Sequence, residues 1–522
     1  MRAFVLLLVL AACQTASHPP PIHEPHVLAA GAIDRYPVRL ASGESAAIVV
    51  TQQGVDVVVE TFAPDGARLA TVDSPNGREG DEPTEIVAPR AGEYHVVVRA
   101  LEPKASGHYT LAVTFRDAAQ TRAVLDERAR ARTAATEWLR ARSGPITLRD
   151  AAVDGAGLAR FDALWASARI VGLGEATHGS RQFGDMRLAL TLRAIERHGV
   201  RVVGLEGSAS RMRLVDAWTR DGAGDLAAMI GKQWINRRAF TALATAVRAW
   251  NTAHPGDPVT IVGLDDQDNA PAREIVARAV RTLDTATATR ADAVLARLVT
   301  AEAQAMVFGP SNVSPDDWRF LAALVARVPA DAQPAARTLA QSAELNSGAP
   351  DAHSRDWLMA ENLLAVAGER RALYWGHNAH VAHPPDKRGE RATSGGRFAE
   401  RTGAYAALGL SFRDGGFLAQ LPNDLQDRLQ TFNVRAADPD SIDGVLAPLG
   451  RAIVTWRGDR AAPPAWLAEP RPMHWIGALY SEAPIPDQVY RPTRLLDEYD
   501  GVVVLDHVDA EPSTEIGIDR AP

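Results

Sequence analysis

Three side chains that could take part in acid–base chemistry lie close together in GLGEATHGSRQF, residues 172–183. Glu175, Thr177 and His178 directly follow a strand-like run at 168–171. A neutral imidazole held by a carboxylate can remove a proton from water, because its pKa lies near neutral pH. The stretch is therefore a candidate for half of an active site, and an ordinary strand-to-helix turn is the alternative.

Four further segments share this pattern of a short apolar run that ends in a polar group. They are RVVGLEG (201–207), VTIVGLDD (259–266), ALYWGHNAH (372–380) and AALGLSF (406–412). Continuous apolar runs separated by helical patterns are typical of buried parallel strands. Ligands bind at the carboxyl ends of such strands, so we expect one shared site. Its polar side chains would be Glu175, Glu206, Asp265, Asp266, His377 and His380.

Several common catalytic patterns are absent from the sequence. It contains no G-x-S-x-G, no H-E-x-x-H and no G-x-G-x-x-G after a strand, and GEATHGSR lacks the lysine of a P-loop. Cys13 is the only cysteine and lies in a predicted export signal, which excludes thiol catalysis. The remaining His/Glu set predicts hydrolysis by activated water, with an arginine or a second imidazole stabilising the oxyanion. We expect no cofactor.

Composition narrows the class of protein and of partner. The 522 residues are 46% hydrophobic and 23% charged, close to the average of globular proteins. A net charge of −8 and a pI of about 6.0 argue against a nucleic-acid partner, because no strongly basic surface is implied. After the N-terminus, no apolar stretch is long enough to span a membrane.

The N-terminal segment indicates export. Residues 1–12 read as a signal peptide, and Leu10-Ala11-Ala12-Cys13 resembles the lipobox of bacterial lipoproteins, in which the cysteine is lipidated. We therefore expect a lipoprotein anchored through Cys13 to a membrane of the bacterial envelope, facing the periplasm. A general export signal in which Cys13 is incidental is the alternative. Residues 13–29 are Pro-rich and are expected to form a tether.

Three parts follow the tether. Residues 30–117 alternate short β-branched runs with turn signals such as PDG (64–66), which predicts a small antiparallel β-sandwich. The strand and turn pattern resembles the pre-peptidase C-terminal domain family. Residues 118–142 are expected to form a helical linker. Residues 143–512 are expected to form an α/β domain with a largely parallel central sheet, flanked by helices and carrying a helical subdomain.

The main domain resembles the erythromycin esterase family. The resemblance rests on GLGEATHGSRQFGDMRLALTLRAIERHGVRVVGLEG, GLDDQDN, RDWLMAENLLAVAG and YWGHNAHVA. It implies a carboxylic ester hydrolase that cleaves a small-molecule ester or macrolactone, including inactivation of macrolides. Some relatives are instead named after succinoglycan biosynthesis, which keeps an envelope polysaccharide-related role open. The implied fold is α/β, with a helical excursion at about 270–350.

The resemblance also implies roles for individual residues. His178 corresponds to the proposed general base, and Glu175 and Glu206 match two acidic positions. Arg187 falls where the family has an essential arginine, and His377 and His380 match its paired histidines. Gln182 stands where many members have glutamate. Asp265, Asp266 and Trp375 are predicted substrate-binding residues.

Structural roles remain open for most of these residues. Glu175, Glu206, Asp265 and Asp266 could cap helices, Arg187 could pair with a carboxylate, and His380 could act only through its neighbours. A metal-dependent hydrolase is a second hypothesis, because His178, His377, His380 and two glutamates offer enough ligands for zinc or manganese. A non-catalytic binding lipoprotein is the third.

Overall fold

A computed structural model describes residues 22–74, 76–231, 237–305, 312–383, 393–421, 429–459, 461–481 and 489–512. The chain divides into two compact units, one of residues 1–131 with 483–489 and one of residues 132–482 with 490–522. Within the described ranges, no helix combines the length and apolar character that a bilayer span requires. Cys13 and the predicted signal peptide lie outside the described residues.

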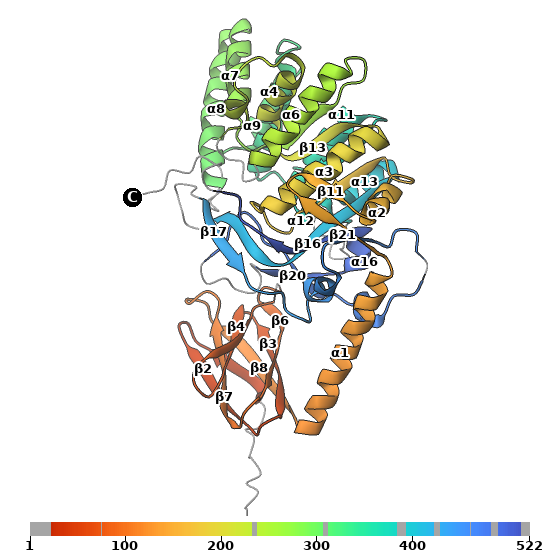
Figure 1. Cartoon of the computed structure of the whole chain (residues 1–522). Helices are drawn as coiled ribbons and strands as arrows, with labels where there is room; N and C mark the ends of the chain where they lie inside the picture. The colour runs from red at the N-terminus through yellow and green to blue at the C-terminus, as the bar shows by residue number, and fades with distance from the viewer. Residues whose placement is uncertain are drawn as a thin grey trace, which may run out of the picture. The chain divides into compact units, whose positions relative to one another are not determined.

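The first unit contains the predicted antiparallel β-sandwich (Figure 1). Alternate residues of its strands, such as Ala46, Ile48 and Val50, point into a shared apolar core. One sheet has the order β1 (Ile22–Leu28), β8 (Gly107–Arg116), β3 (Ser45–Gln53) and β6 (Glu79–Val87). The other has the order β2 (Ile33–Leu40), β7 (Gly92–Ala100), β4 (Val57–Phe62) and β5 (Arg68–Val72).

The predicted tether is too long at its C-terminal end. Ile22–Leu28 pairs with β8 as strand β1, whereas the sequence placed it in an extended segment. The Pro-rich composition of 13–29 hid this strand, whose contacts lie about 80 residues further along the chain at Gly107–Leu111. After the sandwich, α1 runs from Ala118 to Arg140.

The second unit is built on a mixed, mostly parallel sheet, which confirms the predicted fold class. Its described strands follow the order β14-β13-β15-β12-β16-β21-β18-β9, with β17 pairing to β16. The first six are parallel, and β18, β9 and β17 are antiparallel to their neighbours. Their bounds are β14 Thr260–Asp265, β13 Val200–Ser208, β15 Arg371–Trp375, β12 Ile170–Leu173, β16 Tyr405–Gln420, β21 Gly501–Val508, β18 Ala452–Thr455, β9 Ser143–Pro145 and β17 Leu429–Val434.

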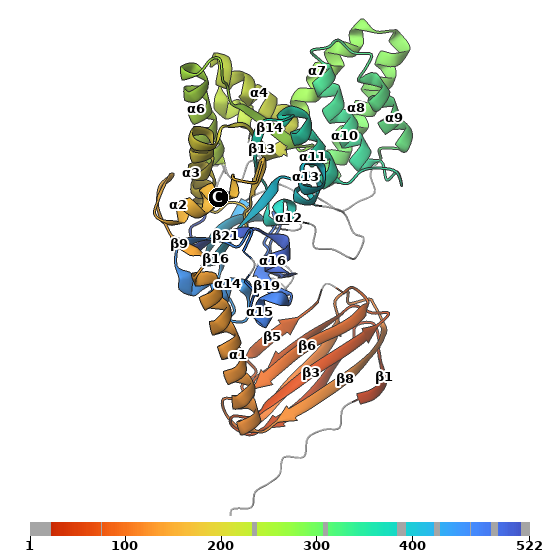
Figure 2. The ribbon, with the colours of Figure 1, turned by 90° about the vertical axis from the view of Figure 1, so that its right-hand side faces the viewer.

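Helices cover both sides of this sheet (Figure 2), as buried parallel strands require. One side carries α3 (Arg181–His198) and α6 (Arg237–Ala253), and the other carries α11 (Arg355–Ala367) and α13 (Ser394–Thr402). The remaining helices of this part are α2 Gly157–Leu164, α4 Ala209–Asp221, α5 Leu226–Ile230 and α12 Asn378–Val381.

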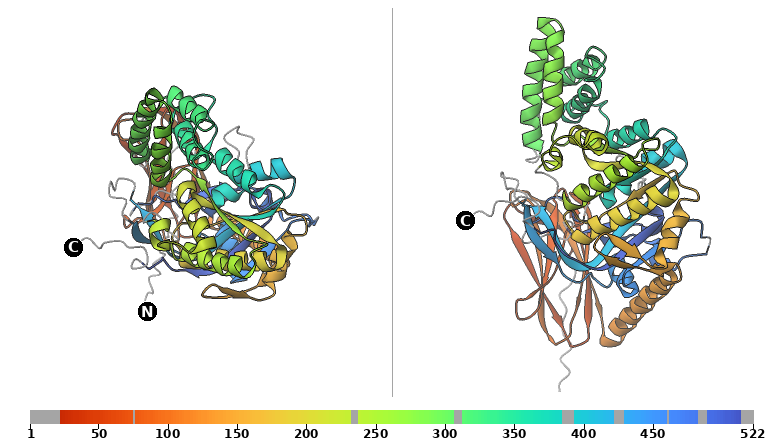
Figure 3. Two further views of the ribbon diagram at one scale, coloured as in Figure 1. Left: turned by 90° about the horizontal axis from the view of Figure 1, so that it is seen from above. Right: turned by 45° about the horizontal axis from the view of Figure 1, so that its top comes forward.

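A helical lobe interrupts the sheet between β14 and β15, close to the predicted excursion. It is drawn in green in Figure 3 and has its own apolar core, which includes Val294, Leu298, Leu321 and Leu339. Its helices are α7 Ala270–Ala279, α8 Thr285–Ala305, α9 Pro315–Leu324 and α10 Gln333–Asn346.

Short elements complete the unit around the sheet. Two small antiparallel pairs are β10 (Thr147–Arg149) with β11 (Ala152–Asp154), and β19 (Arg471–His474) with β20 (Tyr490–Thr493). The short helices near the C-terminus are α14 Ile442–Leu446, α15 Ala465–Ala468 and α16 Leu495–Glu498.

Candidate active site

The register of the parallel sheet brings the predicted polar residues to one edge. Leu173 of β12 and Leu205 of β13 both pair with Trp375 of β15. The next residues along these strands are therefore level with one another, which places Glu175, Glu206 and His377 at the same carboxyl end. Asp265, the last residue of β14, pairs with Ser208 at this end of the sheet.

Backbone contacts hold the G-E-A-T-H and G-H-N-A-H segments together. The Asn378 N–H donates to the Glu175 carbonyl at 2.8 Å, and the Gly376 N–H donates to the Leu173 carbonyl. Gly174 allows this approach, because a Cβ there would lie 2.1 Å from Oδ1 of Asn378. The two motifs, about 200 residues apart in the chain, therefore form one rigid platform.

Glu175 lies between the His178 imidazole and the Arg187 guanidinium. Its Oε1 is 2.7 Å from His178 Nδ1, and its Oε2 is 2.7 Å from Arg187 Nη2. Glu175 and Arg187 are buried, whereas the His178 side chain is 19% exposed. No described residue makes a hydrogen bond to His178 Nε2. The carboxylate thus orients the ring and leaves its second nitrogen accessible.

The charged neighbours of His178 raise the pKa of its imidazole. Burial alone would raise the pKa of Glu175, but Arg187 and His178 outweigh it and hold that pKa below its usual value. Burial likewise opposes protonation of His178, yet Glu175 and then Glu206 raise its pKa above the usual 6.5. His178 is therefore a stronger base than a free histidine.

His377 is fixed as a neutral ring by the backbone. Its Nε2 lies 3.1 Å from the Ile476 carbonyl, and the Ala379 N–H donates to its Nδ1 at 3.2 Å. Because a carbonyl only accepts and an N–H only donates, the proton is on Nε2. Burial and the neighbouring His178 and His380 lower the pKa of His377 to about 3. Because both ring nitrogens are hydrogen-bonded to the backbone, His377 has none left to bind substrate. Its ring instead packs near His178, with the two ring centres 5.3 Å apart.

His380 is in the opposite state, held between two carboxylates. Its Nδ1 is 2.8 Å from Asp356 Oδ1, and its Nε2 is 3.3 Å from Glu206 Oε1. Burial disfavours the charged ring, but Glu206 and Asp356 raise the pKa of His380 to about 10. Arg355 Nη1 lies 3.1 Å from the same Nε2. We assign His380 as an imidazolium, which cannot accept from Arg355, so the two cations share Glu206 Oε1 as their acceptor, 3.3 Å from His380 Nε2 and 2.9 Å from Arg355 Nη2.

Glu206 connects the parts of the site. Its Oε2 accepts the His377 backbone N–H at 2.6 Å, and its Oε1 accepts Arg355 Nη2 at 2.9 Å. Burial would raise the pKa of Glu206, but His380 and Arg355 hold it well below the usual range. Glu206 therefore stays ionised and fixes the G-H-N-A-H turn from outside that segment.

Arg355 and Asp356 are functional candidates that the sequence reasoning missed. The Arg355 Nε and Nη2 form a two-pronged contact with the Asp265 carboxylate at 2.9 and 2.6 Å, and the side chain is 35% exposed. Asp356 binds His380 and also accepts the Ser394 backbone N–H. The signal was available, since RDWLMAENLLAVAG carries part of the family resemblance and begins with these two residues.

The three predicted substrate-binding residues lie in different surroundings. Asp265 is buried and holds Arg355, with Gln267 donating to it as well, so it acts through Arg355. Asp266 is partly buried, and its carbonyl accepts from Asn269. Trp375 is 1% exposed, and its indole N–H donates to Thr191. The prediction of substrate contact is wrong for Trp375, which packs 5.0 Å beneath Arg187.

Gln182, the departure from the family pattern, binds the C-terminal segment. Its Nε2 donates to Asp509 Oδ2 at 2.7 Å, while its Oε1 accepts the Asp509 backbone N–H at 2.7 Å. A glutamate at this position would face the Asp509 carboxylate with a like charge. The Gln182 amide can both donate to and accept from Asp509, which a glutamate could not do.

The described residues contain no group of three or more His, Cys, Asp or Glu side chains arranged to hold a metal ion. Both nitrogens of His377 are bound by the backbone, and both nitrogens of His380 face carboxylates. His178 Nε2 is then the one imidazole nitrogen of this set without a described partner. This donor arrangement favours proton transfer at His178 over metal ligation.

Comparisons with known proteins found one family model and several solved structures of similar fold. The sequence model described as erythromycin esterase matches residues 195–508, a range that includes Glu206, Arg355, His377 and His380 and begins after His178 and Arg187. The comparison with curated proteins gave no match.

Three solved structures share the fold of the second unit. A Bacillus cereus protein is 19% identical with a TM-score of 0.59, covering 73% of this chain and 98% of its own. A succinoglycan biosynthesis protein is 16% identical with a TM-score of 0.59 and the same coverage. A mutant of the erythromycin esterase EreC, in its open conformation, is 16% identical with a TM-score of 0.52, covering 68% of this chain and 95% of its own.

Proposed function

Because the chain belongs to the erythromycin esterase family, we propose that it hydrolyses an ester or macrolactone with a water molecule activated by His178. One observation carries the proposal. The His178 ring is bound at Nδ1 by ionised Glu175, while its Nε2 is accessible and has no partner among the described residues. This is the arrangement that a general base requires.

The first step forms a tetrahedral intermediate. His178 Nε2 accepts a proton from water as the water oxygen bonds to the carbonyl carbon, and the carbonyl electron pair moves to its oxygen. Glu175 then faces an imidazolium, whose positive charge its carboxylate stabilises at 2.7 Å. Arg187 keeps Glu175 ionised and does not contact the reacting atoms, because it is buried.

The second step releases the products. The carbonyl forms again, the bond to the leaving alkoxide breaks, and the His178 imidazolium returns its proton to that oxygen. In a lactone, the acid and the alcohol stay in one molecule, which gains one water. No covalent enzyme intermediate is needed.

Arg355 would stabilise the oxyanion between these steps, and His380, whose nitrogens both face carboxylates, would add positive charge nearby. Both are cations at the same carboxyl edge, and the Arg355 side chain is 35% exposed. Asp265, Glu206 and Asp356 fix both groups in place, so little reorganisation accompanies the reaction.

The proposed substrate class is a small-molecule ester or lactone, with macrolides as one candidate. The test uses the purified chain without its signal segment against a panel of macrolides and simple esters, followed by mass spectrometry. Addition of one water to a macrolide would support macrolide inactivation, as would lower drug susceptibility of a sensitive host that expresses the chain. Turnover of simple esters alone would support the hydrolase and reject the macrolide. Absence of turnover on every compound would leave the family assignment unchanged and direct the search to envelope polysaccharides and to metal-loaded protein.

The proposed location is a bacterial envelope membrane, reached through lipidation of Cys13, which lies outside the described residues. Fractionation of cells that express the full chain tests this. Wild-type protein is expected in the membrane fraction and Cys13→Ser in the soluble fraction. Equal distribution of the two would contradict the anchor.

A further inference from the structure

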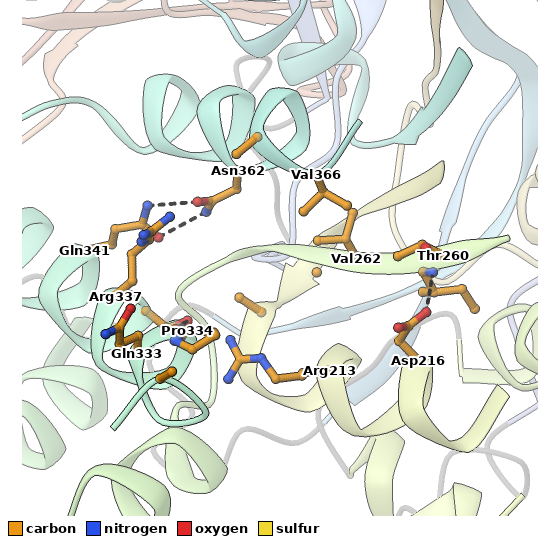
Figure 4. Close-up of a pocket in the computed structure, with 16 residues that line it drawn as sticks. Arg213, Asp216, Thr260, Val262, Gln333, Pro334, Arg337, Gln341, Asn362 and Val366 are labelled. Carbon is orange, nitrogen blue, oxygen red and sulfur yellow. Dashed lines mark hydrogen bonds between the residues drawn. The ribbon is translucent and has the colours of Figure 1, made fainter. Parts of the chain in front are cut away.

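A cavity of about 350 Å³ lies beside the edge strand of the sheet, apart from the His/Glu site. Its walls come from four elements, β14, α4, α10 and α11 (Figure 4). It borders Thr260 to Gly263 of β14, whereas the catalytic edge begins at Asp265. A cavity of this size can enclose a small organic molecule.

Two arginines reach this cavity from different helices. Arg213 extends from α4 toward Gln333 and Pro334 at the start of α10, and Arg337 projects from α10 (Figure 4). Neither guanidinium makes a hydrogen bond or an ion pair with any residue that the structure describes. Arg337 is exposed to solvent, whereas Arg213 is partly buried, so the cavity holds one partly buried positive charge that no described carboxylate pairs with.

The missing counter-ion has an energetic consequence at Arg213. This side chain is partly buried, and burial lowers its pKa, so the folded protein bears a desolvation cost. Arg211, two residues earlier on α4, is also partly buried but pairs with Asp268. Of these two arginines of α4, Arg211 therefore has a carboxylate partner and Arg213 has none among the described residues. An anionic ligand in the cavity would provide that partner for Arg213.

Asp216, the carboxylate at the far side of the cavity, is already engaged. It accepts the Ile261 backbone N–H of the edge strand at 3.0 Å and binds Arg220 at 3.2 Å. Because it occupies that N–H, it also blocks addition of a peptide strand at this position of β14. The site is thus suited to a small molecule.

The rest of the wall is apolar or neutral. Ala209, Val262, Ala365 and Val366 line it. The side-chain amides of Gln341 and Asn362 each donate a hydrogen bond to the other, at 2.8 and 3.0 Å. We propose that this cavity binds a small amphipathic anion, with its carboxylate or phosphate between Arg213 and Arg337 and its hydrocarbon part against the apolar wall.

Calorimetric titration of the full chain tests the proposal with matched probes. Hexanoate and hexyl phosphate carry the two candidate head groups, hexanol lacks the charge, and inorganic phosphate lacks the hydrocarbon. Arg213→Met and Arg337→Gln remove the charges. Arg281→Gln is the control, because Arg281 lies in the helical lobe, as Arg337 does, but is exposed outside the cavity and pairs with Asp292.

We expect wild type and Arg281→Gln to bind hexanoate or hexyl phosphate, and the stronger of the two identifies the head group. Binding should weaken at least about tenfold in Arg213→Met and Arg337→Gln. Hexanol, which lacks the charge, and inorganic phosphate, which lacks the hydrocarbon, should both bind more weakly than the amphipathic anions. His178→Ala should keep wild-type affinity, which separates this cavity from the catalytic site.

Unfolding without ligand gives a second readout. Arg213→Met should melt at the wild-type temperature or higher, because it removes an unpaired, partly buried charge. Equal affinities of Arg213→Met and Arg281→Gln, or no binding of any probe by wild type up to about 10 mM, would overturn the proposal.

Discussion

Glu175 Oε1 and His178 Nδ1 lie 2.7 Å apart, and Arg187 holds the other oxygen of the same carboxylate. The orientation of the general base and its basicity therefore depend on one buried carboxylate. The structure offers a comparable arrangement away from the site, in which Asp162 Oδ1 lies 2.8 Å from His198 Nε2 and the same carboxylate also pairs with Arg193.

Glu175→Gln should lower kcat by about 10²–10⁴-fold, because the amide no longer stabilises the His178 imidazolium. Steady-state kinetics on the substrate found in the panel measure this effect. Asp162→Asn is the matched control and should leave kcat near the wild-type value. Equal losses in the two variants would indicate a general effect of removing a carboxylate that pairs with a histidine and an arginine.

The pH dependence of kcat/KM should report the protonation of His178. The base acts in its neutral form, and Glu175 and Glu206 raise its pKa above 6.5. Activity should therefore increase with pH along a limb whose midpoint lies above 6.5, and Glu175→Gln should move that midpoint to lower pH. A midpoint below 6.5 in the wild type would contradict this assignment.

Arg355→Lys should reduce kcat by roughly 10²–10³-fold although the charge is kept, because lysine cannot make the two-pronged contact that aims the guanidinium. Arg297 supplies the control, since it makes the same kind of contact with Asp317 at 3.0 and 2.5 Å in the helical lobe. Arg297→Lys should retain wild-type kcat. Unchanged activity of Arg355→Lys would remove Arg355 from the mechanism.

Dialysis against a chelator should leave activity unchanged, because the ring nitrogens of His377 and His380 are bound by backbone groups and carboxylates. Elemental analysis of the dialysed protein checks that metal has been removed. Loss of activity that one divalent ion restores would favour the metal-dependent hydrolase instead.

Sequence patterns predicted the features that depend on residues close together along the chain. The apolar runs located β12 to β16, and the polar groups after them located Glu175, Glu206 and His377, because parallel strands share a carboxyl edge. The family resemblance added Arg187, which no local pattern distinguishes from other helical arginines.

The remaining contacts depend on the tertiary fold. The Ile476 carbonyl that binds His377 lies 99 residues further along the chain, in a loop without a recognisable pattern. Trp375 is the last residue of an apolar strand, where a cleft residue could lie, but the packing of Arg187 and Thr191 buries it. Arg355 begins a helix in sequence and becomes part of the site only through Asp265 and Glu206, on two other strands.

Hydrolysis in water labelled with heavy oxygen, by wild type and by His178→Ala, tests whether His178 activates the attacking water. The wild-type product should carry one labelled oxygen in its carboxyl group, and His178→Ala should lose turnover with an unchanged unfolding temperature. Turnover by His178→Ala within about tenfold of wild type would contradict the role of His178 as the base.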